Sequence, residues 1–151
     1  VPAFTGLGAP YWDANSRGVL SGITRDTSPK EIVRATIEAV AYQTHDLFEA
    51  MKHDGLRPKI VKVDGGMVMN NWFSQFLSDI VNVGVLRPKV QETTALGAAF
   101  MAGLHIGVYK SLKDISKNWS LDKKFRPKMK KAHRSKLIKG WSKSIKRTLI
   151  N

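Results

Sequence analysis

The strongest constraint on the fold lies in residues 59–71, where an apolar strand pattern runs into two glycines and then into a helical pattern. The β-branched run 60–63 predicts a strand, and a helix pattern begins near Asn70. Gly65 and Gly66 lack Cβ atoms, so the strand ends in bare backbone. Ligands of open α/β sheets bind at this end of the strands. A turn that binds no ligand has the same sequence pattern, so the neighbouring segments must distinguish a binding site from a plain turn.

Asn70 lies four residues after Gly66 and carries an amide that can both donate and accept hydrogen bonds. A helix that starts nearby directs free backbone N–H groups toward the site. We therefore predict a nucleotide-binding site at Gly65, Gly66 and Asn70, with a base or ribose lying on the glycines. The segment lacks the Gly-Lys-Ser/Thr signature of a P-loop and is not a dinucleotide fingerprint.

The length of 151 residues fits one domain, and 42% apolar residues can form a core. The chain has no cysteine, which excludes disulfides and thiol catalysis and fits a reducing, cytoplasmic compartment. No apolar run approaches membrane-spanning length, so we expect no membrane partner. The chain opens on Val1 inside a loop-like segment, from which we expect a fragment of a longer protein.

The net charge of +13 is confined to one end of the chain. Residues 1–109 carry ten Lys and Arg against ten Asp and Glu, whereas residues 110–151 carry fifteen against two. A basic tail of this kind is typical either of a nucleic-acid contact or of a solvated, lysine-rich helix face. We favour the solvated face, because single-sign charge marks non-specific attraction rather than fold.

Helix and strand patterns alternate along the chain, which predicts an α/β sheet with packed helices. Ser28, Pro29 and Glu31 form a capping box that begins a helix running to about Lys52, with a broad apolar face expected to be buried. The other predicted elements are a loop at 1–17, strands at 18–23, 59–64 and 83–86, helices at 70–81, 95–107 and 130–149, and a weakly structured linker at 110–129.

The stretch 92–99 (ETTALGAA) predicts a helix start capped by Thr93 or Thr94. Gly97 inside that helix predicts close packing against a sheet or helix, because glycine costs roughly 1 kcal/mol there relative to alanine. Close packing of that kind either is purely structural or lets the helix support the neighbouring nucleotide site.

Few side chains have a spacing that predicts chemistry. Asp64 is the one acid beside the predicted site, and we expect it to bond backbone in the turn. The opening loop, with Asp13 and its aromatics, either lines a cleft or is a surface loop. The four histidines lack metal-ligand spacing, so no catalytic or metal-ligating residue is predicted.

Several stretches resemble one known family. These are residues 1–13 (VPAFTGLGAPYWD), 18–38, 63–71 (VDGGMVMNN) and 92–99, followed by 125–127 and the Trp141 helix. The family is the glycerol kinases, a branch of the FGGY carbohydrate kinases. The first four stretches resemble its opening loop, its second signature, its adenosine motif and the conserved stretch after that motif. The last two resemble its C-terminal end. The resemblance covers essentially the whole chain.

The resemblance implies an actin-like, ribonuclease-H-like ATPase fold whose two domains close over ATP and Mg²⁺ while glycerol is phosphorylated to sn-glycerol 3-phosphate. It assigns residues 1–109 to part of the FGGY C-terminal domain and residues 110–151 to a linker and a basic helix packed on it. Carried over by motif, Gly66 and Asn70 bind the nucleotide and Gly65 neighbours them. The family's assemblies imply a homo-oligomer.

The family's first domain has no counterpart here, and with it are missing the catalytic base, the glycerol contacts and the first phosphate motif. Mg²⁺ contacts are expected mainly outside this chain, which alone is expected to be inactive because phosphoryl transfer needs these groups together. The alternatives are another FGGY sugar kinase, such as one for a pentulose, and a non-catalytic basic nucleic-acid-binding domain. The glycerol-kinase-like opening loop argues against the first alternative.

Overall fold

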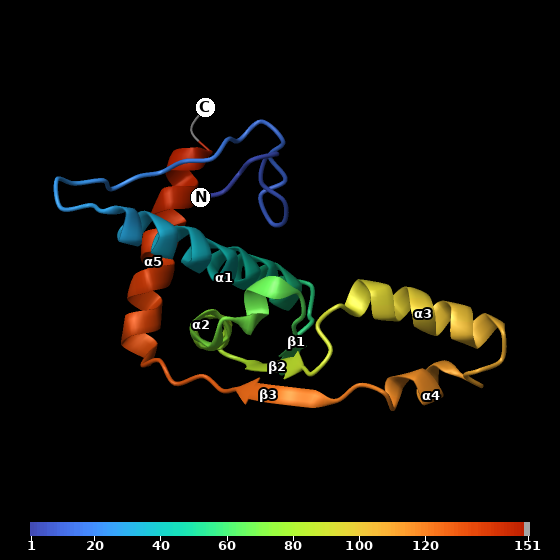
Figure 1. Ribbon diagram of the computed structural model, residues 1–151. Coiled ribbons are helices and arrows are strands. Elements are labelled where there is room, and N and C mark those ends of the chain that lie inside the picture. The colour runs from blue at the N-terminus through green and yellow to red at the C-terminus, as the bar shows by residue number, and fades with distance from the viewer. Residues whose placement is uncertain (150–151) are drawn as a thin grey trace.

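A small mixed sheet with helices beside it makes up the computed structural model, which describes residues 1–149 (Figure 1). In chain order the elements are α1 (Pro29–His53), β1 (Ile60–Lys62), the 3-10 turn η1 (Gly66–Met69), α2 (Asn71–Val81), β2 (Gly84–Pro88), α3 (Thr93–His105), α4 (Leu112–Ser116), β3 (Leu121–Phe125) and α5 (Lys131–Thr148). Helices and strands alternate from α1 to α3, which confirms the predicted α/β class.

The sheet has the strand order β1-β2-β3. β1 and β2 are parallel, with Ile60 opposite Gly84, and α2 is the crossover that parallel strands need. β3 runs antiparallel to β2. The prediction of weak structure for residues 110–129 is therefore wrong. Only Phe125 of β3 is buried, so this polar edge strand lacks the apolar alternation that reveals a strand in sequence.

The predicted strand at residues 18–23 does not form. Val19 exchanges backbone hydrogen bonds with Val1, at 2.9 and 2.8 Å, and the rest of the segment is an extended loop with Leu20 and Ile23 exposed. A strand needs a neighbouring ladder to satisfy its backbone groups, and no strand lies beside this segment in the described part of the chain.

The capping box of α1 is confirmed. The Ser28 N–H donates to the Glu31 carboxylate at 2.8 Å, and the Ser28 hydroxyl accepts from the Lys30 N–H at 3.2 Å. Asp54 ends the helix, followed by Gly55 at a positive φ of 83°. The two bonds of the capping box satisfy backbone N–H groups at the start of α1 that would otherwise lack a partner.

The predicted burial of the whole apolar face of α1 is wrong. The helices α2 and α5 cover only the strip that carries Ala41, Tyr42 and Phe48. Outside this strip, Ile32 remains 39% exposed and Leu47 45% exposed. The apolar residues of α1 thus span a wider face of the helix than the other described residues cover.

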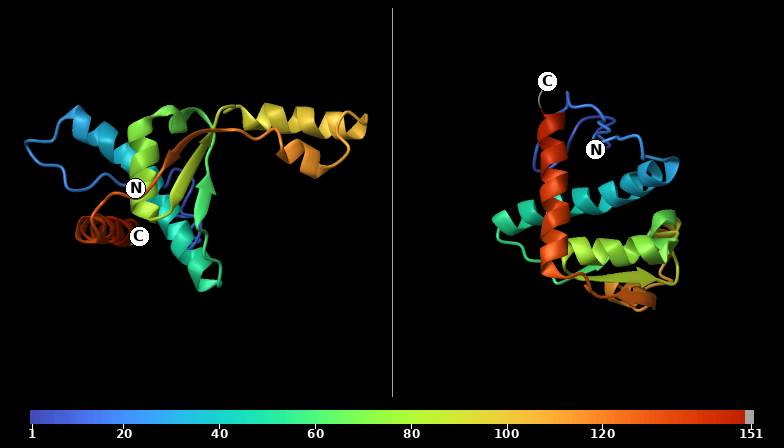
Figure 2. Two further views of the ribbon diagram at one scale, coloured as in Figure 1. Left: turned by 90° about the horizontal axis from the view of Figure 1, so that it is seen from below. Right: turned by 90° about the vertical axis from the view of Figure 1, so that its left-hand side faces the viewer.

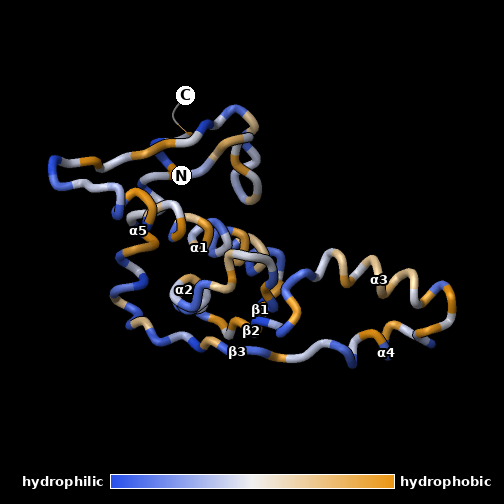
Figure 3. Tube along the Cα trace, in the orientation of Figure 1, coloured by the Kyte–Doolittle hydropathy of each residue, from blue (hydrophilic) through white to orange (hydrophobic). Residues whose placement is uncertain are grey.

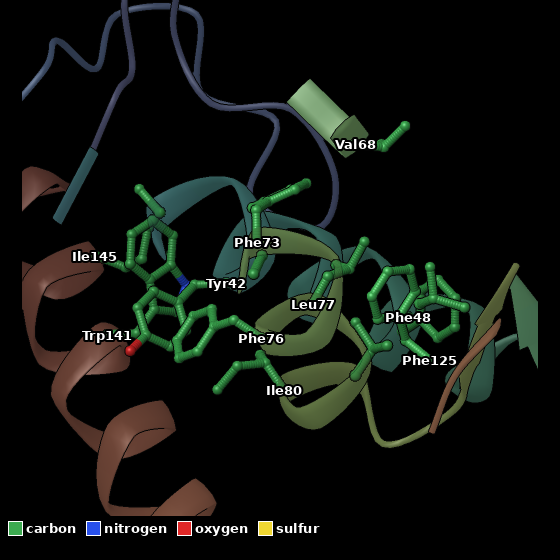
Figure 4. Packing of buried hydrophobic residues seen from close by; sticks show 14 of the residues in the cluster. Tyr42, Phe48, Val68, Phe73, Phe76, Leu77, Ile80, Phe125, Trp141 and Ile145 are labelled. Atoms are coloured by element: carbon green, nitrogen blue, oxygen red, sulfur yellow. The ribbon is translucent and has the colours of Figure 1, made fainter. Parts of the chain in front are cut away.

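An aromatic cluster joins α1, α2 and α5 (Figure 4). The Tyr42 ring stacks on Trp141 of α5 with centroids 5.4 Å apart, and meets Phe76 of α2 edge-on at 5.7 Å. Trp141 and Ile145, four residues apart on one face of α5, are buried, although Leu149 at its end is exposed. Stacked and edge-on aromatic pairs stabilise beyond their buried area.

Two carboxylates, the half-buried Asp46 and the buried Asp79, tie distant segments together. Asp46 of α1 accepts hydrogen bonds from the Tyr11 hydroxyl at 3.0 Å and from the Trp141 indole N–H at 2.6 Å. Asp79 of α2 accepts from the backbone N–H groups of Lys128 and Met129, at 2.5 and 3.0 Å. The first carboxylate holds the opening loop and α5 on α1, and the second fixes the approach to α5.

α3 and α4 form an arm that extends away from the sheet (Figures 1 and 2). α3 is mostly apolar along its trace (Figure 3), with Met101 and the following Ile106 exposed. The close packing predicted for Gly97 is wrong for the described residues, because a Cβ there meets no atom within 4 Å. Tight packing occurs instead at Gly103, where a Cβ would lie 2.9 Å from the Tyr109 ring.

No helix within residues 1–149 combines the length and the apolar character needed to cross a membrane.

Replacing Asp46 tests how much its two hydrogen bonds stabilise the fold. In Asp46→Ala, the buried Trp141 N–H and the Tyr11 hydroxyl lose a charged acceptor, so we expect the free energy of unfolding to fall by about 2–3 kcal/mol. Urea denaturation measures it. Glu49→Ala, one turn further along, removes an exposed carboxylate and should cost less than about 0.5 kcal/mol. Equal losses in the two variants would contradict this role of Asp46.

The opening loop should respond to acid through Asp13. Hydrogen bonds from the Ser16 hydroxyl, at 2.6 Å, and the Asn15 N–H hold the pKa of Asp13 below its ordinary value. These bonds stabilise the loop above the unfolded pKa and are lost as pH falls through the lower native pKa. In Ser16→Ala we expect the pKa of Asp13 to rise, measured by carboxyl carbon NMR, and in Ser21→Ala to stay unchanged. Identical Asp13 titrations in wild type and Ser16→Ala would refute this.

Candidate functional site

The predicted site residues lie together in one exposed turn, Gly65–Asn70, which we call the glycine ledge. The backbone leaves β1, Gly65 adopts a positive φ of 84°, and its N–H donates to the Gln91 carbonyl at 3.3 Å. Gly66 is exposed, and a Cβ built on either glycine meets no atom within 4 Å. The ledge is therefore open backbone at the carboxyl end of a parallel strand, as its sequence predicts.

Asn70 is the N-cap of α2. Its side-chain oxygen accepts from the N–H groups of Trp72 and Phe73, at 2.9 and 3.2 Å. These two bonds orient the amide, and within residues 1–149 its NH₂ group has no hydrogen-bond partner. The oxygen of the Asn70 amide is thus used in capping α2, which leaves its NH₂ group as the donor available to a ligand.

The sequence reasoning missed the 3-10 turn η1 inside the ledge. This turn separates the glycines from α2, and Asn70 itself uses the N–H groups of Trp72 and Phe73. Two of the N–H groups that were expected to be free for the site are therefore occupied by the N-cap side chain. Short 3-10 turns often precede helices, and the four residues 66–69 are too few for a periodic signal.

Arg87 on β2 also escaped the sequence reasoning. Its guanidinium is buried and donates to the carbonyls of Val68 and Met69 within η1, at 2.8 and 3.2 Å. The signal that could have found it is a charged residue in the otherwise apolar strand GVLRP, since a buried arginine almost always has partners.

Asp64 accepts a hydrogen bond from the Thr93 hydroxyl, so the structure gives it a side-chain partner rather than the expected turn backbone. Thr93 is the first residue of α3, and the N-cap position falls on Glu92, whose side chain makes no capping bond. The prediction that Thr93 or Thr94 caps this helix is therefore wrong. Thr93 instead ties the start of the α3 arm to Asp64, the residue just before the ledge.

Within residues 1–149, no three His, Asp or Glu side chains lie close enough to hold a metal ion. His45 lies 3.6 Å from the carboxylates of Asp46 and Glu49, its neighbours on α1. Tyr11 of the opening loop bonds Asp46, whereas Phe4 and Trp12 are largely exposed. The ledge thus offers open glycine backbone, two exposed methionines and one amide donor, a surface that suits recognition of a flat, uncharged ligand.

Comparison with known proteins identifies the family. Residues 1–106 match the model of the FGGY family of carbohydrate kinases, C-terminal domain. Glycerol kinase 1 of Pseudomonas aeruginosa is 55% identical over 147 residues, and the glycerol kinase of Ectopseudomonas mendocina is 55% identical over 148. Each alignment covers 97% of this chain and 30% of the relative, so the chain spans less than a third of these proteins.

Solved structures agree with this match. The crystal structure of Plasmodium falciparum glycerol kinase with ADP superimposes with a TM-score of 0.84 at 38% identity, covering 100% of this chain and 30% of that one. Ligand-bound xylulose kinase from Lactobacillus acidophilus superimposes with a TM-score of 0.79 at 28% identity. That match covers 99% of this chain and 31% of the xylulose kinase chain. The predicted actin-like fold class is thereby confirmed, and the chain belongs to the FGGY family of carbohydrate kinases.

Proposed function

We propose that this chain carries the adenosine-binding part of an ATP-dependent glycerol kinase, which converts glycerol and ATP to sn-glycerol 3-phosphate and ADP. The observation that carries the proposal is the open glycine ledge beside the oriented amide donor of Asn70. Adenine is a flat heterocycle with ring-nitrogen acceptors. It can lie against Gly65 and Gly66 while the Asn70 NH₂ group donates to one of those nitrogens.

Glycerol is favoured over a pentulose as the substrate. The two relatives at 55% identity are named glycerol kinases, and the ADP-containing structure at 38% identity is one too. The xylulose kinase is 28% identical, although its fold is nearly as similar. Because the fold is common to both classes, the sequence identity and the glycerol-kinase-like opening loop carry the choice.

The described residues supply binding and orientation rather than the chemical step. Residues 1–149 present no group of acidic side chains that could hold Mg²⁺, and Asp64 is bonded to Thr93. In-line phosphoryl transfer needs a positioned nucleophile and stabilisation of the transferred charge. In this proposal those groups belong to the part of the enzyme that the chain does not span. A homo-oligomeric assembly and a cytoplasmic location remain predictions.

Nucleotide binding by the 151-residue chain tests the proposal. Half of a site should bind weakly, so we expect ADP to shift the amide NMR signals of Gly65, Gly66 and Asn70 with a Kd on the order of 1 mM, about −4 kcal/mol. Asn70→Ser keeps a capping oxygen but removes the amide donor, and should weaken ADP about fivefold. In Gly66→Val, a side chain fills the space above the ledge without straining a positive φ, so binding should be lost.

Gly140→Val is the matched control for the ledge substitution. Gly140 lies on α5, and a Cβ there also meets nothing within 4 Å, so the same change is made away from the ledge. This variant should bind ADP like the wild type. The proposal fails if ADP shifts signals elsewhere and leaves the ledge unchanged, or if Gly66→Val binds as well as Gly140→Val.

The isolated chain should not phosphorylate glycerol. A coupled assay that follows ADP formation should give the same rate with and without the chain, because the proposal places the catalytic base and the Mg²⁺ contacts outside this chain. The Pseudomonas aeruginosa enzyme serves as the positive control. Turnover above background that depends on glycerol would show that the chain carries more of the active site than we propose.

A further inference from the structure

Arg87 is a permanently charged side chain placed inside the fold. It lies on the central strand β2 and is only 7% exposed. A guanidinium carries five N–H donors and does not deprotonate, so burying it destabilises a protein unless the charge is paired and the donors are used. Its hydrogen-bond partners therefore indicate why an arginine stands in an apolar strand.

The partners come from two different elements. The Arg87 Nε donates to the Asp122 carboxylate on β3 at 2.7 Å. The Nη1 group donates to the carbonyls of Val68 and Met69, at 2.8 and 3.2 Å. The planar guanidinium thus binds the Asp122 carboxylate on one side and the 3-10 turn η1 on the other. Its central carbon, Cζ, lies 5.6 Å from the centre of the Phe125 ring.

The Met69 carbonyl depends on such a donor. The last carbonyls of a short helical turn have no partner within the turn. Val68 also accepts from the Ser74 hydroxyl at 2.9 Å, but Met69 has no donor other than Arg87 among the described residues. Val68 and Met69 lie between Gly66 and Asn70. Fixing their carbonyls therefore sets the distance and angle between the two predicted nucleotide contacts.

We propose that Arg87 is a positioning residue for the glycine ledge, with Asp122 orienting its guanidinium. This inference rests on the proposed nucleotide-binding function. Lysine cannot replace it, because a single ammonium group cannot donate to the Asp122 carboxylate and the η1 carbonyls in the same fork geometry. The ledge is thus shaped by a side chain that does not itself face the ligand.

The test compares Arg87→Lys and Arg87→Met with two controls in the ligand-free 151-residue chain. We expect both variants to shift the amide NMR signals of residues 66–70 and the Asn70 NH₂ signal. Amide exchange at Val68 and Asn70 should become about tenfold faster. Arg134→Lys alters an arginine whose partner is Asn82 and should leave these signals in place. Asp46→Ala lowers global stability and should leave them in place too.

ADP titration then tests whether the position of the ledge affects nucleotide binding. Arg87→Lys should weaken ADP about tenfold, as expected when a charge-assisted contact is lost, whereas Arg134→Lys should not. Ledge signals that match the wild type in folded Arg87→Lys would overturn the inference. If Arg87→Met does not fold, Arg87→Lys alone decides. If the wild type does not bind ADP, the proposed function fails, while the ligand-free signals still decide the role of Arg87.

Discussion

The packing of Tyr42 against Phe76 and Trp141 is the interaction on which the arrangement of the helices depends. The ring lies where α1, α2 and α5 meet, so the three helices share one set of contacts (Figure 4). The sheet has only three short strands and cannot build a core alone. Burial of these aromatic rings therefore holds α2 against α1 and α5, and α2 in turn begins directly after the glycine ledge.

Buried polar groups make this packing specific. Apolar contacts alone tolerate sliding and rotation of helices, whereas a hydrogen bond to a buried carboxylate has one geometry. Asp46 sets α5 and the opening loop on α1, Asp79 sets the approach to α5, and Arg87 sets η1 against β2. Each of these groups joins segments far apart in the chain, and each would be costly to leave unpaired.

Local signals made the alternating elements predictable from sequence. The capping box at Ser28 and the apolar spacing around Trp141 are each contained within a few turns of helix. The predictions failed where the outcome depends on distant partners. β3 is a strand because β2 lies beside it, whereas residues 18–23 have no strand beside them in the described part of the chain. Likewise, the glycines of the ledge were recognisable, but the role of Arg87 depends on a fold that brings three elements together.

The charges around the ledge favour the nucleoside part of a nucleotide over its phosphates. Arg87, the cation that reaches this turn, donates to the Asp122 carboxylate and to backbone carbonyls. Lys62, at the end of β1, lies over the Trp119 ring with its ammonium 4.2 Å from the ring centre. The exposed surface of the ledge is thus uncharged, because it consists of glycine backbone, the Met67 and Met69 side chains and the Asn70 amide. Such a surface can hold an uncharged base and ribose, while neutralising a triphosphate requires cations or a metal supplied by other residues.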